Sequence, residues 1–469
     1  MTSSKRPSQQ RKAEGSAAFT SRSTQKELYA RGKGLRSKCP RSSHAAWKPP
    51  QSRLDPIQLV EEANVGRIPE LVPIRHGRMM QSPFTFYRGI ALNMASDLAV
   101  TPVTGVCVQV CGDAHLGNFR CFATPERRVN FDIHDLDETL PGPWEWDVKR
   151  LAASFVLASR NNNLSEKSAR DAVLACVRSY REHMSKFSKM RTLDIWYARF
   201  EAETLIEKLG NPDTRRSARK ILTKARERSV LEHDFPKLVQ GTIPPRIKDN
   251  PPTIYHWREQ GHEEFSALVR DAFDRYGRTL AADRRVLLGR FVLQDIAIKV
   301  VGVGSVGTLC FVVLMMAGAR DPLFLQLKQA RPSVLEAYAG KSIYPNHGQR
   351  VVVGHRLMQS ASDIFLGWTE AKFGHYYVRQ LRDVKIKFDV ERFDASQMFQ
   401  FAEFCGSTLA RAHARSGEPA MISGYLGKGD VFDKAIAAFS VAYADQTERD
   451  YERFKNAVRK GRLKAIVER

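Results

Sequence analysis

The sequence lacks the cysteine patterns of a disulfide scaffold or a zinc ribbon. Its 469 residues include seven cysteines, which are scattered, odd in number and free of any C-x-x-C pair. Such usage favours a reducing compartment. The N-terminus has no apolar segment of the kind that a secretory signal needs, and we find no zinc-finger motif, RNP motif or internal repeat. We therefore expect a cytoplasmic protein, and the 43% apolar share supports a buried core.

Only one long uncharged run is present. Residues 300–319, VVGVGSVGTLCFVVLMMAGA, carry no charge over 20 residues, which is enough to cross a bilayer. Four glycines interrupt the run, however, and β-branched residues dominate it. The pattern predicts two buried strands around a glycine turn and no membrane span.

Acidic residues are scarce relative to basic ones, and the net charge is +23. Residues 1–50 hold twelve Lys and Arg against two Glu and are rich in Ser, Gln and Pro. We expect residues 1–55 to form a disordered basic tail that binds polyanions weakly and without specificity. A second basic cluster, RRSARKILTKARER at 215–228, is interpreted as the solvated face of a helix.

Hydrophobic periodicity predicts an α+β fold. Residues 56–260 form a helical lobe with strands at 106–113 and 127–135, a helix at 141–160 and a Pro-rich loop from 236. Residues 261–395 form a strand-rich lobe, with a helix at 262–298 and strands at 299–316, 322–328, 350–358 and 375–381. Residues 396–469 are C-terminal helices.

Polar residues gather where two predicted strands end. GDAHLGN (112–118) places Asp113 and Asn118 five residues apart across a turn. A carboxylate there can accept a proton from a substrate hydroxyl, and the amide oxygen can ligate a hard cation. FDIHDLDE (131–138) then supplies Asp132 and Asp135, oxygen ligands of the kind that Mg²⁺ prefers.

These two motifs resemble the active site of protein kinases. The Asp113–Asn118 spacing is that of their D-x-x-x-x-N catalytic loop. GDAHLGN is similar to the GDLHPGN form of aminoglycoside and choline phosphotransferases, and IHDLDE resembles their IDFGD segment. The resemblance implies that Asp113 is the base, that Asn118 and Asp135 hold Mg²⁺, and that Asp135 is a better metal ligand than Asp132.

The flanking residues extend the resemblance and also depart from it. WEWDVKRLAASF (144–155) is similar to the helix that follows these motifs, which implies a structural role for Asp147 in supporting the catalytic loop. Cys111 stands where those enzymes usually have His or a similar residue. His115 could contact the loop or the substrate, or could be a turn histidine bonded to the backbone.

A nucleotide cradle is expected further along the chain. KVVGVGSVGTLCFVVLM (299–315) contains a G-x-G-x-x-G pattern, and its position between two strand-like runs is typical of a glycine loop in a hairpin covering phosphates. The glycines are Gly302, Gly304 and Gly307. Lys328 follows on the apolar strand PLFLQLKQA, where it could contact the phosphates of ATP, with Glu336 as a candidate partner.

The glycine loop follows the catalytic loop in this sequence, whereas it precedes it in ordinary kinases. We therefore expect a circularly permuted, two-lobe, protein-kinase-like fold. From about residue 50 to 460 the chain is similar to a bacterial family known as domain of unknown function 2252, through SPFTFYRG, GDAHLGNF, FDIHDLDET, GPWEWDVKRLAAS, VGVGSVGT and LMQSASDIFLGW, among other segments. That family name implies no activity.

Three functions follow from these patterns. The first is an ATP- and Mg²⁺-dependent phosphotransferase with an unknown hydroxyl-bearing acceptor. The second is a non-catalytic nucleotide-binding or nucleic-acid-associated protein, suggested by the basic charge. A metallophosphoesterase is less well supported, because its GN-H-[DE] segment is missing. Arg88, Arg356 and Arg379 are candidate phosphate ligands or structural ion-pair partners.

Overall fold

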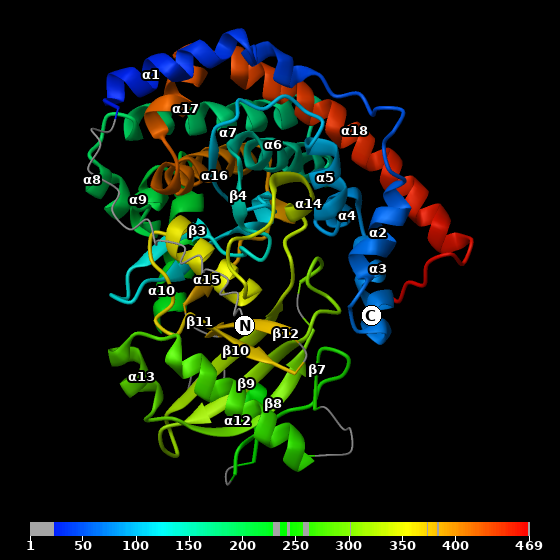
Figure 1. The fold of residues 1–469 in the computed structure, drawn as a ribbon, viewed down its shortest axis with the longest axis vertical. Helices are drawn as coiled ribbons and strands as arrows, with labels where there is room; N and C mark the ends of the chain where they lie inside the picture. Colours follow the sequence, from blue (N-terminus) through cyan, green and yellow to red (C-terminus); the bar gives the residue numbers. More distant parts are fainter. Residues whose placement is uncertain are drawn as a thin grey trace, which may run out of the picture.

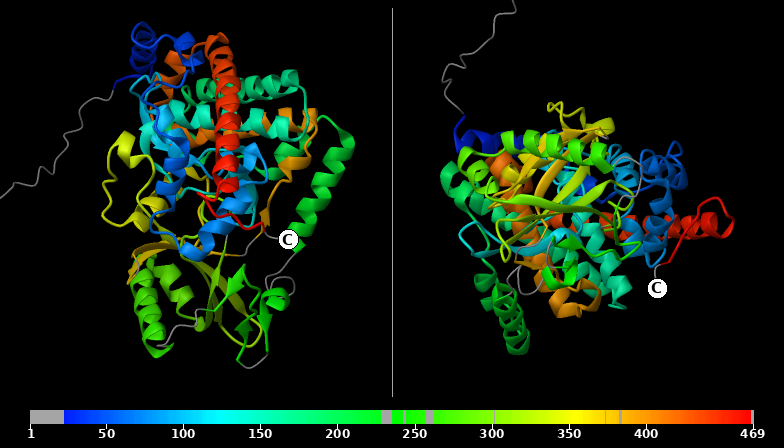
Figure 2. Two further views of the ribbon diagram at one scale, coloured as in Figure 1. Left: turned by 90° about the vertical axis from the view of Figure 1, so that its right-hand side faces the viewer. Right: turned by 90° about the horizontal axis from the view of Figure 1, so that it is seen from below.

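Helices and strands gather in two parts of this α+β protein (Figure 1). The computed structural model describes residues 23–227, 235–241, 244–256, 262–300, 302–372, 374–381 and 384–467. Most helices lie at one end of the molecule, and a six-stranded sheet lies at the other, as two further views also show (Figure 2).

The helices and strands have the following bounds. The helices are α1 (Gln25–Gly34), α2 (Pro56–Asn64), α3 (Val72–Met79), α4 (Pro83–Tyr87), α5 (Ala91–Leu98), α6 (Trp144–Asn161), α7 (Glu166–Phe187), α8 (Thr192–Tyr197), α9 (Ala202–Glu207), α10 (Pro212–Glu227), α11 (Phe235–Leu238), α12 (His262–Arg278), α13 (Ala282–Leu288), α14 (Glu336–Ala339), α15 (His347–Met358), α16 (Ala395–Ser416), α17 (Pro419–Leu426) and α18 (Val431–Arg459). The strands are β1 (Cys107–Val110), β2 (Phe119–Ala123), β3 (Val129–Ile133), β4 (Leu140–Pro143), β5 (Val239–Gln240), β6 (Arg246–Ile247), β7 (Ile254–Tyr255), β8 (Val292–Lys299), β9 (Cys310–Met316), β10 (Pro322–Ala330), β11 (Gly367–Ala371), β12 (Gly374–Gln380) and β13 (Lys385–Ile386).

The large sheet has the strand order β11-β12-β10-β9-β8-β7, and every neighbouring pair is antiparallel. Side chains alternate between its two faces. Leu325 and Leu327 of β10 pack in one apolar cluster with Tyr276 of α12. Lys328 therefore points to the opposite face, where its neighbour across the strands is Tyr377 of β12.

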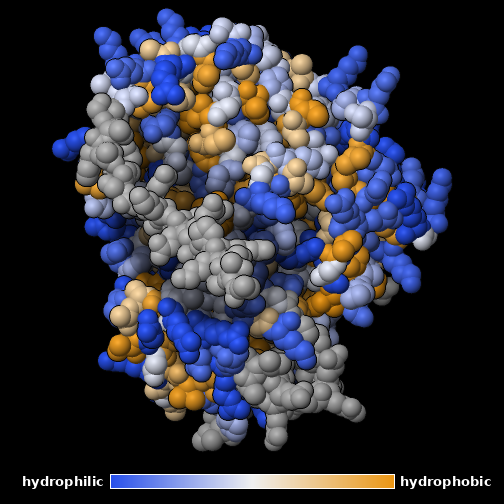
Figure 3. Space-filling model, viewed as in Figure 1, coloured by the Kyte–Doolittle hydropathy of each residue, from blue (hydrophilic) through white to orange (hydrophobic). Residues whose placement is uncertain are grey.

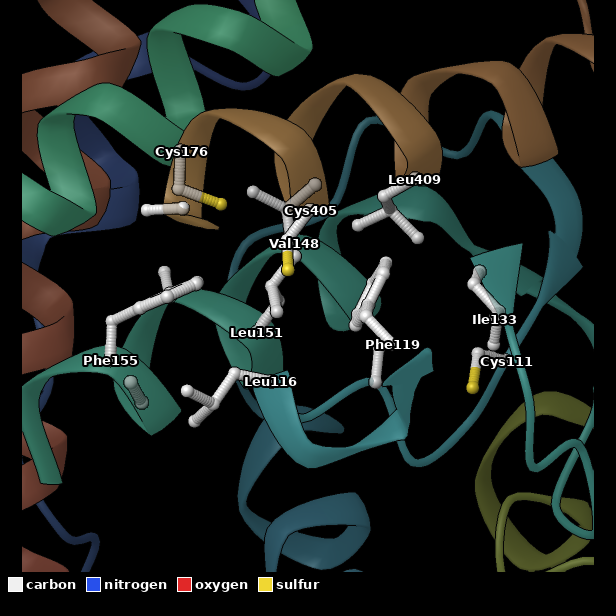
Figure 4. Close-up of a cluster of buried hydrophobic side chains, with 14 of the residues drawn as sticks. Cys111, Leu116, Phe119, Ile133, Val148, Leu151, Phe155, Cys176, Cys405 and Leu409 are labelled. Atoms are coloured by element: carbon white, nitrogen blue, oxygen red, sulfur yellow. The ribbon is translucent and has the colours of Figure 1, made fainter. Parts of the chain in front are cut away.

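The helical part is built around α6, α7, α16 and α18. Gly406 lets α16 approach α7 closely, because a Cβ at this position would lie 2.1 Å from the carbonyl oxygen of Cys176. Figure 4 shows the apolar core beneath the predicted catalytic loop, in which Leu116 lies near Leu151 and Phe119. The loop after β1 is thus fixed from below by its own apolar side chains.

Two small sheets position the polar motifs. Strand β1 pairs with β4 and ends just before Asp113. Strand β3 pairs with β2 and ends just before the segment that carries Asp135. These strands lie within the stretches 106–113 and 127–135 where the sequence predicts them.

The expected disordered tail is wrong for residues 23–55, whereas residues 1–22 lie outside the described part. Helix α1 begins with a capping box, in which Thr24 accepts from the backbone N–H of Glu27. It packs on α17, and Arg36 donates to the carbonyl oxygen of Tyr425 at 2.9 Å. His44 is fully buried and bonded to the Tyr425 hydroxyl at 2.7 Å. Composition missed these anchors because most of the other basic residues of the segment face solvent.

Two further element predictions are wrong. Residues 350–358 belong to helix α15 and not to a strand, because Asn346 caps the helix by accepting from the N–H of Gln349. A short apolar run fits a strand and a buried helix equally well. The helix expected at 262–298 ends early, and residues 292–299 form β8. Strand β11 was not expected.

The uncharged run and the basic cluster have simple structural explanations. Residues 310–316 of the run form the fully buried strand β9 after a glycine turn. None of the described helices has the length and apolar character to cross a membrane. The basic cluster forms most of α10, where Arg219 and Arg226 pair with Glu207 and Glu203 of α9. Hydrophilic residues cover much of the face in Figure 3, with hydrophobic ones interspersed.

Candidate active site

The loop after β1 is held by a buried carboxylate of helix α6. Asp147 accepts hydrogen bonds from the backbone N–H groups of Cys111 at 2.6 Å and Gly112 at 3.0 Å. His413 of α16 lies 3.1 Å from the same carboxylate. Asp147 therefore supports the loop, which is the structural role expected for it. The Cys111 thiol contacts the carbonyl oxygen of Asp135 at 3.4 Å, so this residue links the two predicted motifs.

Asp113 forms an ion pair with Arg150, a residue that the sequence interpretation did not single out. Arg150 Nε donates to Asp113 Oδ1 at 2.6 Å, and the arginine is almost fully buried. Burial raises the pKa of Asp113 to about 6, although the charge of Arg150 opposes this rise. Arg150 follows Asp147 by three residues on α6, so both side chains lie on one helix face, and this spacing could have revealed it.

Asn118 and His115 complete the loop through backbone contacts. The Asn118 amide nitrogen donates to the carbonyl oxygen of Asp113 at 2.7 Å, which turns the amide oxygen away from that carbonyl. His115 Nδ1 accepts from the N–H of Gly117 at 3.1 Å, so the neutral ring carries its proton on Nε2. Burial holds the pKa of His115 well below its ordinary value. His115 is thus a turn histidine that also lines the cavity described below.

Lys328 reaches across from the sheet to the loop after β3. Its Nζ lies 3.5 Å from Asp135 Oδ2 and also forms an ion pair with Asp137. Asp137 additionally accepts from the Tyr377 hydroxyl at 2.8 Å. Burial alone would raise the pKa of Asp135, but the charges of Lys328 and Arg379 outweigh it and hold that pKa below its ordinary value.

Asp135 retains an oxygen without a protein partner. Its Oδ1 is buried and makes no hydrogen bond to any described residue. A buried carboxylate oxygen in this state is costly unless a ligand binds to it. Asp135 also lines the cavity, so the oxygen is placed where a cation could be held.

One cavity of about 410 Å³ joins the two predicted motifs. Asp113, His115, Asn118 and Asp135 line it from the helical part, and the glycine loop lines it from the sheet. Its other polar lining residues are Glu62, Arg67, Arg75, Arg88, Arg120, Asp137, Glu138, Ser305, Thr308, Gln329, Arg331, Ser333 and Glu336.

The glycine loop contributes unequally to this cavity. Gly302 and Gly304 line it, whereas Gly307 lies behind the loop, where its carbonyl oxygen accepts from the N–H of Ile68 at 2.7 Å. Gly302 and Gly307 have positive φ values of 70° and 87°, a region that glycine adopts readily. Arg78 donates to the carbonyl oxygen of Gly302 at 2.6 Å and so ties the loop to α3.

Asp132 and Glu336 do not occupy the places expected for them. Asp132 is fully buried outside the cavity, where its carboxylate pairs with Arg411 and accepts from Ser360. These contacts give it a structural role and leave Asp135 as the metal-ligand candidate of the two. Glu336 accepts from the N–H of Ser333 and lies 4.0 Å from Arg350, so it is not the partner of Lys328.

Arg356 and Arg379, two of the three arginines that the sequence suggested as phosphate ligands, are bound to protein groups. Arg356 donates to the carbonyl oxygen of Leu366 at 2.9 Å. Arg379 donates to Gln326 at 3.1 Å and to the carbonyl oxygen of His134 at 3.2 Å. Neither lines the large cavity.

The site fits Mg²⁺ as a cation shared with a phosphate. No group of three or more His, Cys, Asp or Glu side chains converges as a metal site within the described residues. Mg²⁺ commonly uses one or two carboxylates and completes its shell with waters and phosphate oxygens. The unpartnered oxygen of Asp135 and the amide of Asn118 match that requirement better than a metal cage made of protein alone would.

The sequence profile of one family covers most of the chain. Residues 67–457 match the profile of the uncharacterized proteins conserved in bacteria known as DUF2252. The chain belongs to this family. The matched region contains every site residue that the sequence predicted, from Asp113 to Lys328, and excludes helices α1 and α2. Neither a curated protein nor a solved structure matches the chain significantly.

Proposed function

We propose that this protein is an ATP- and Mg²⁺-dependent phosphotransferase with a circularly permuted, kinase-like arrangement. The observation that carries the proposal is the meeting of Lys328 with Asp135 beside a cavity that Asp113, Asn118 and the glycine loop also line. A strand lysine, a glycine loop, a base and two oxygen ligands are the parts that phosphoryl transfer needs. They come from two segments of the chain in the reverse of the usual order.

Each residue has a role that its surroundings support. Asp113 would orient the acceptor hydroxyl and take its proton, and Arg150 and the Asp147-bound backbone would fix its position. Asn118 and Asp135 would hold Mg²⁺, which supplies charge neutralisation at the phosphate oxygens. Lys328 would contact the phosphates. Phosphate oxygens would then replace its carboxylate partners, so the lysine would stay paired with negative charge. Phosphoryl transfer depends mainly on such positioning and charge compensation.

A non-catalytic nucleotide-binding protein is the second candidate. The ion pair between Arg150 and Asp113 favours it, because Arg150 occupies one carboxylate oxygen of Asp113 and opposes the rise in its pKa. A metallophosphoesterase receives no such support, since its chemistry requires a cluster of metal ligands and the described residues contain none. The unpaired state of all seven cysteines supports a reducing, cytoplasmic location for either candidate.

The test is calorimetric titration of the full chain with Mg-ATP, followed by measurement of ATP turnover. We expect a Kd on the order of 1 μM to 1 mM, typical for a nucleotide substrate. Absence of heat and of a thermal shift at millimolar Mg-ATP would overturn the proposal. Binding without turnover across acceptor mixtures would favour the non-catalytic candidate. Release of phosphate from a simple ester without ATP would point to a phosphoesterase.

A further inference from the structure

Five arginines line the large cavity, and three of them are bound to protein oxygens. Arg67 donates to the carbonyl oxygens of Ala63 at 2.8 Å and Val306 at 2.7 Å. Arg75 donates to Asn64 at 2.8 Å and to the carbonyl oxygen of Gly89 at 2.5 Å. Arg331 donates to the carbonyl oxygen of Val65. These three guanidinium groups shape the wall of the cavity and hold the connections around it.

Arg88 and Arg120 differ from the other three. Arg88 follows α4, and Arg120 lies on β2. In the part of the chain that the structure describes, neither guanidinium makes a hydrogen bond or an ion pair, and the Nε of each is buried without a partner. The only aromatic contact of Arg88 there is the ring of Phe84, 5.9 Å away.

A partly buried guanidinium without a carboxylate partner is energetically unfavourable. Burial lowers the pKa of both arginines below its ordinary value, and the nearby carboxylate charge of Asp135 only partly opposes this. Arg88 also lies within range of the charge of Asp113. Two guanidinium groups without an ion-pair partner among the described residues therefore line the cavity that also holds the proposed base and the proposed metal ligand.

We propose that Arg88 and Arg120 form a subsite for a tetrahedral oxyanion, namely a phosphoryl or phosphate group. Guanidinium groups bind phosphate through charge-assisted, often bidentate hydrogen bonds. His115 lines the same cavity and, with its proton on Nε2, can donate a further hydrogen bond. The inference rests on the proposed function for its meaning: the group is either the terminal phosphoryl of ATP or an anionic group of the acceptor.

Inorganic phosphate is the first probe, titrated into the full chain by calorimetry without nucleotide and at constant ionic strength. The variants are Arg88→Met, Arg120→Met and their combination, and Arg331→Met is the control because it removes a cation of the same cavity that already has a carbonyl partner. Each single variant should weaken phosphate binding by about tenfold or more, as expected for a hydrogen bond to a charged group. The double variant should abolish it, and the control should bind like wild type.

Thermal stability gives a second readout that a structural role would move in the opposite direction. Methionine in place of an unpaired, partly buried guanidinium should leave the melting temperature unchanged or raise it. A marked drop in both single variants would show that the arginines hold the fold. Equal phosphate affinity in wild type and the double variant, or no binding by wild type at about 50 mM phosphate, would likewise overturn the subsite.

Nucleotides then separate the two sources of the group. If the subsite takes the terminal phosphoryl of ATP, phosphate should bind together with Mg-ADP but compete with a non-hydrolysable ATP analogue. If it takes an anionic acceptor, phosphate should bind together with both nucleotides. Loss of phosphate binding in the variants of a protein that never turns over ATP would support the subsite and refute the phosphotransferase. ATP turnover that is unaffected in the double variant would support the phosphotransferase and refute the subsite.

Discussion

Lys328 on strand β10 and Asp135 after strand β3 face each other, with 3.5 Å between the lysine Nζ and a carboxylate oxygen. This contact joins the sheet to the helical part at the cavity that we propose as the active site. Lys328 is only 2% exposed, and its second partner is Asp137. Burial raises the pKa of Asp137. Burial alone would lower the pKa of Lys328, but the charges of Asp135 and Asp137 outweigh it and raise that pKa, so a ligand phosphate would meet a preformed cation.

Asp135→Asn should remove Mg²⁺-dependent nucleotide binding, because the amide keeps the shape of the side chain but loses the charge that holds the metal. We expect the Kd for Mg-ATP to rise at least about tenfold, with a correspondingly smaller dependence on Mg²⁺. Calorimetry with and without Mg²⁺ measures both effects.

Asp132→Asn is the matched control, three residues away. Breaking its buried pair with Arg411 should destabilise the fold by roughly 3–5 kcal/mol, whereas Mg-ATP affinity should persist in the folded fraction. Urea denaturation reports the first quantity and calorimetry the second. A stable Asp132→Asn protein that cannot bind Mg²⁺, beside a silent Asp135→Asn protein, would reverse our choice of metal ligand.

Lys328→Met should weaken binding of both Mg-ATP and Mg-ADP, since we propose that the lysine contacts phosphates common to the two nucleotides. Methionine preserves the volume of the buried stem, so the loss reports the charge. We expect a loss of about ten- to a hundredfold, as for other charged hydrogen bonds. Lys341→Met, at an exposed position, is the control. Equal affinity in both variants would remove Lys328 from the site.

Asp113→Asn should preserve Mg-ATP affinity and lower turnover by about 10²–10⁴-fold, the usual contribution of a general base. The asparagine can still accept a hydrogen bond from Arg150, so the loop should stay in place. Turnover close to wild type would show that Asp113 is structural. The ratio of turnover to affinity is the decisive measurement, because a misfolded loop would lower both.

Local patterns predicted the motif strands, because strand alternation acts over a few residues. The structural role of Asp147 was implied by the kinase resemblance. Arg150 was missed because a basic residue on a helix usually faces solvent. Its spacing from Asp147 indicates a shared helix face, but the burial of Arg150 against Asp113 is seen only in the fold. The sequence favoured Asp135 over Asp132 as a metal ligand only through the kinase resemblance. Asp132 pairs with Arg411 of helix α16, whereas Asp135 faces a cavity that the glycine loop also lines, and both α16 and the glycine loop are distant in the sequence.

The errors in the fold have a similar origin. The apolar run in α15 reads as a strand by composition, and only the Asn346 cap and its tertiary contacts make it a helix. Residues 23–55 are polar overall, yet Cys39 and His44 insert into the apolar helical part. In both cases the segment is buried by residues that are far away in the sequence, and a single sequence does not show such contacts.

Acid should destabilise the protein through its buried neutral histidines. Burial lowers the pKa of His44 to about 3, of His355 to about 3 and of His76 to about 4. In the unfolded chain a histidine titrates near 6.5. Below that pH the unfolded state therefore binds protons that the folded state excludes, so stability falls as the pH decreases from about 6.5 toward 4.

The free energy of unfolding, measured in urea at pH 7 and pH 5, should differ by about 2 kcal/mol for each such histidine. His44→Gln should reduce this difference. His256 provides the opposite case, because burial would lower its pKa but hydrogen bonds to Asp295 and Asp249 raise it. His256→Gln should therefore enlarge the acid-induced loss. If the free energy of unfolding had the same pH dependence in wild type and in both variants, neither His44 nor His256 would contribute to the pH dependence of stability.

Replacing Gly112 should destabilise the protein more than its positive φ alone would explain. Gly112 and Gly105 have nearly equal φ values of 80° and 79°. A Cβ at Gly105 would meet nothing within 4 Å, whereas one at Gly112 would lie 2.5 Å from the carbonyl oxygen of Glu138. Gly105→Ala should thus cost about 1–2 kcal/mol for the left-handed conformation alone. Gly112→Ala should cost about 1–3 kcal/mol more, because it pushes the Asp113 loop away from the segment that carries Asp135 and Asp137.

Urea denaturation of the two variants isolates the steric contribution, and Mg-ATP affinity should fall in Gly112→Ala only. Equal stabilities would mean that the two loops can separate freely, and the close coupling between the proposed base and the proposed metal ligand would then be lost.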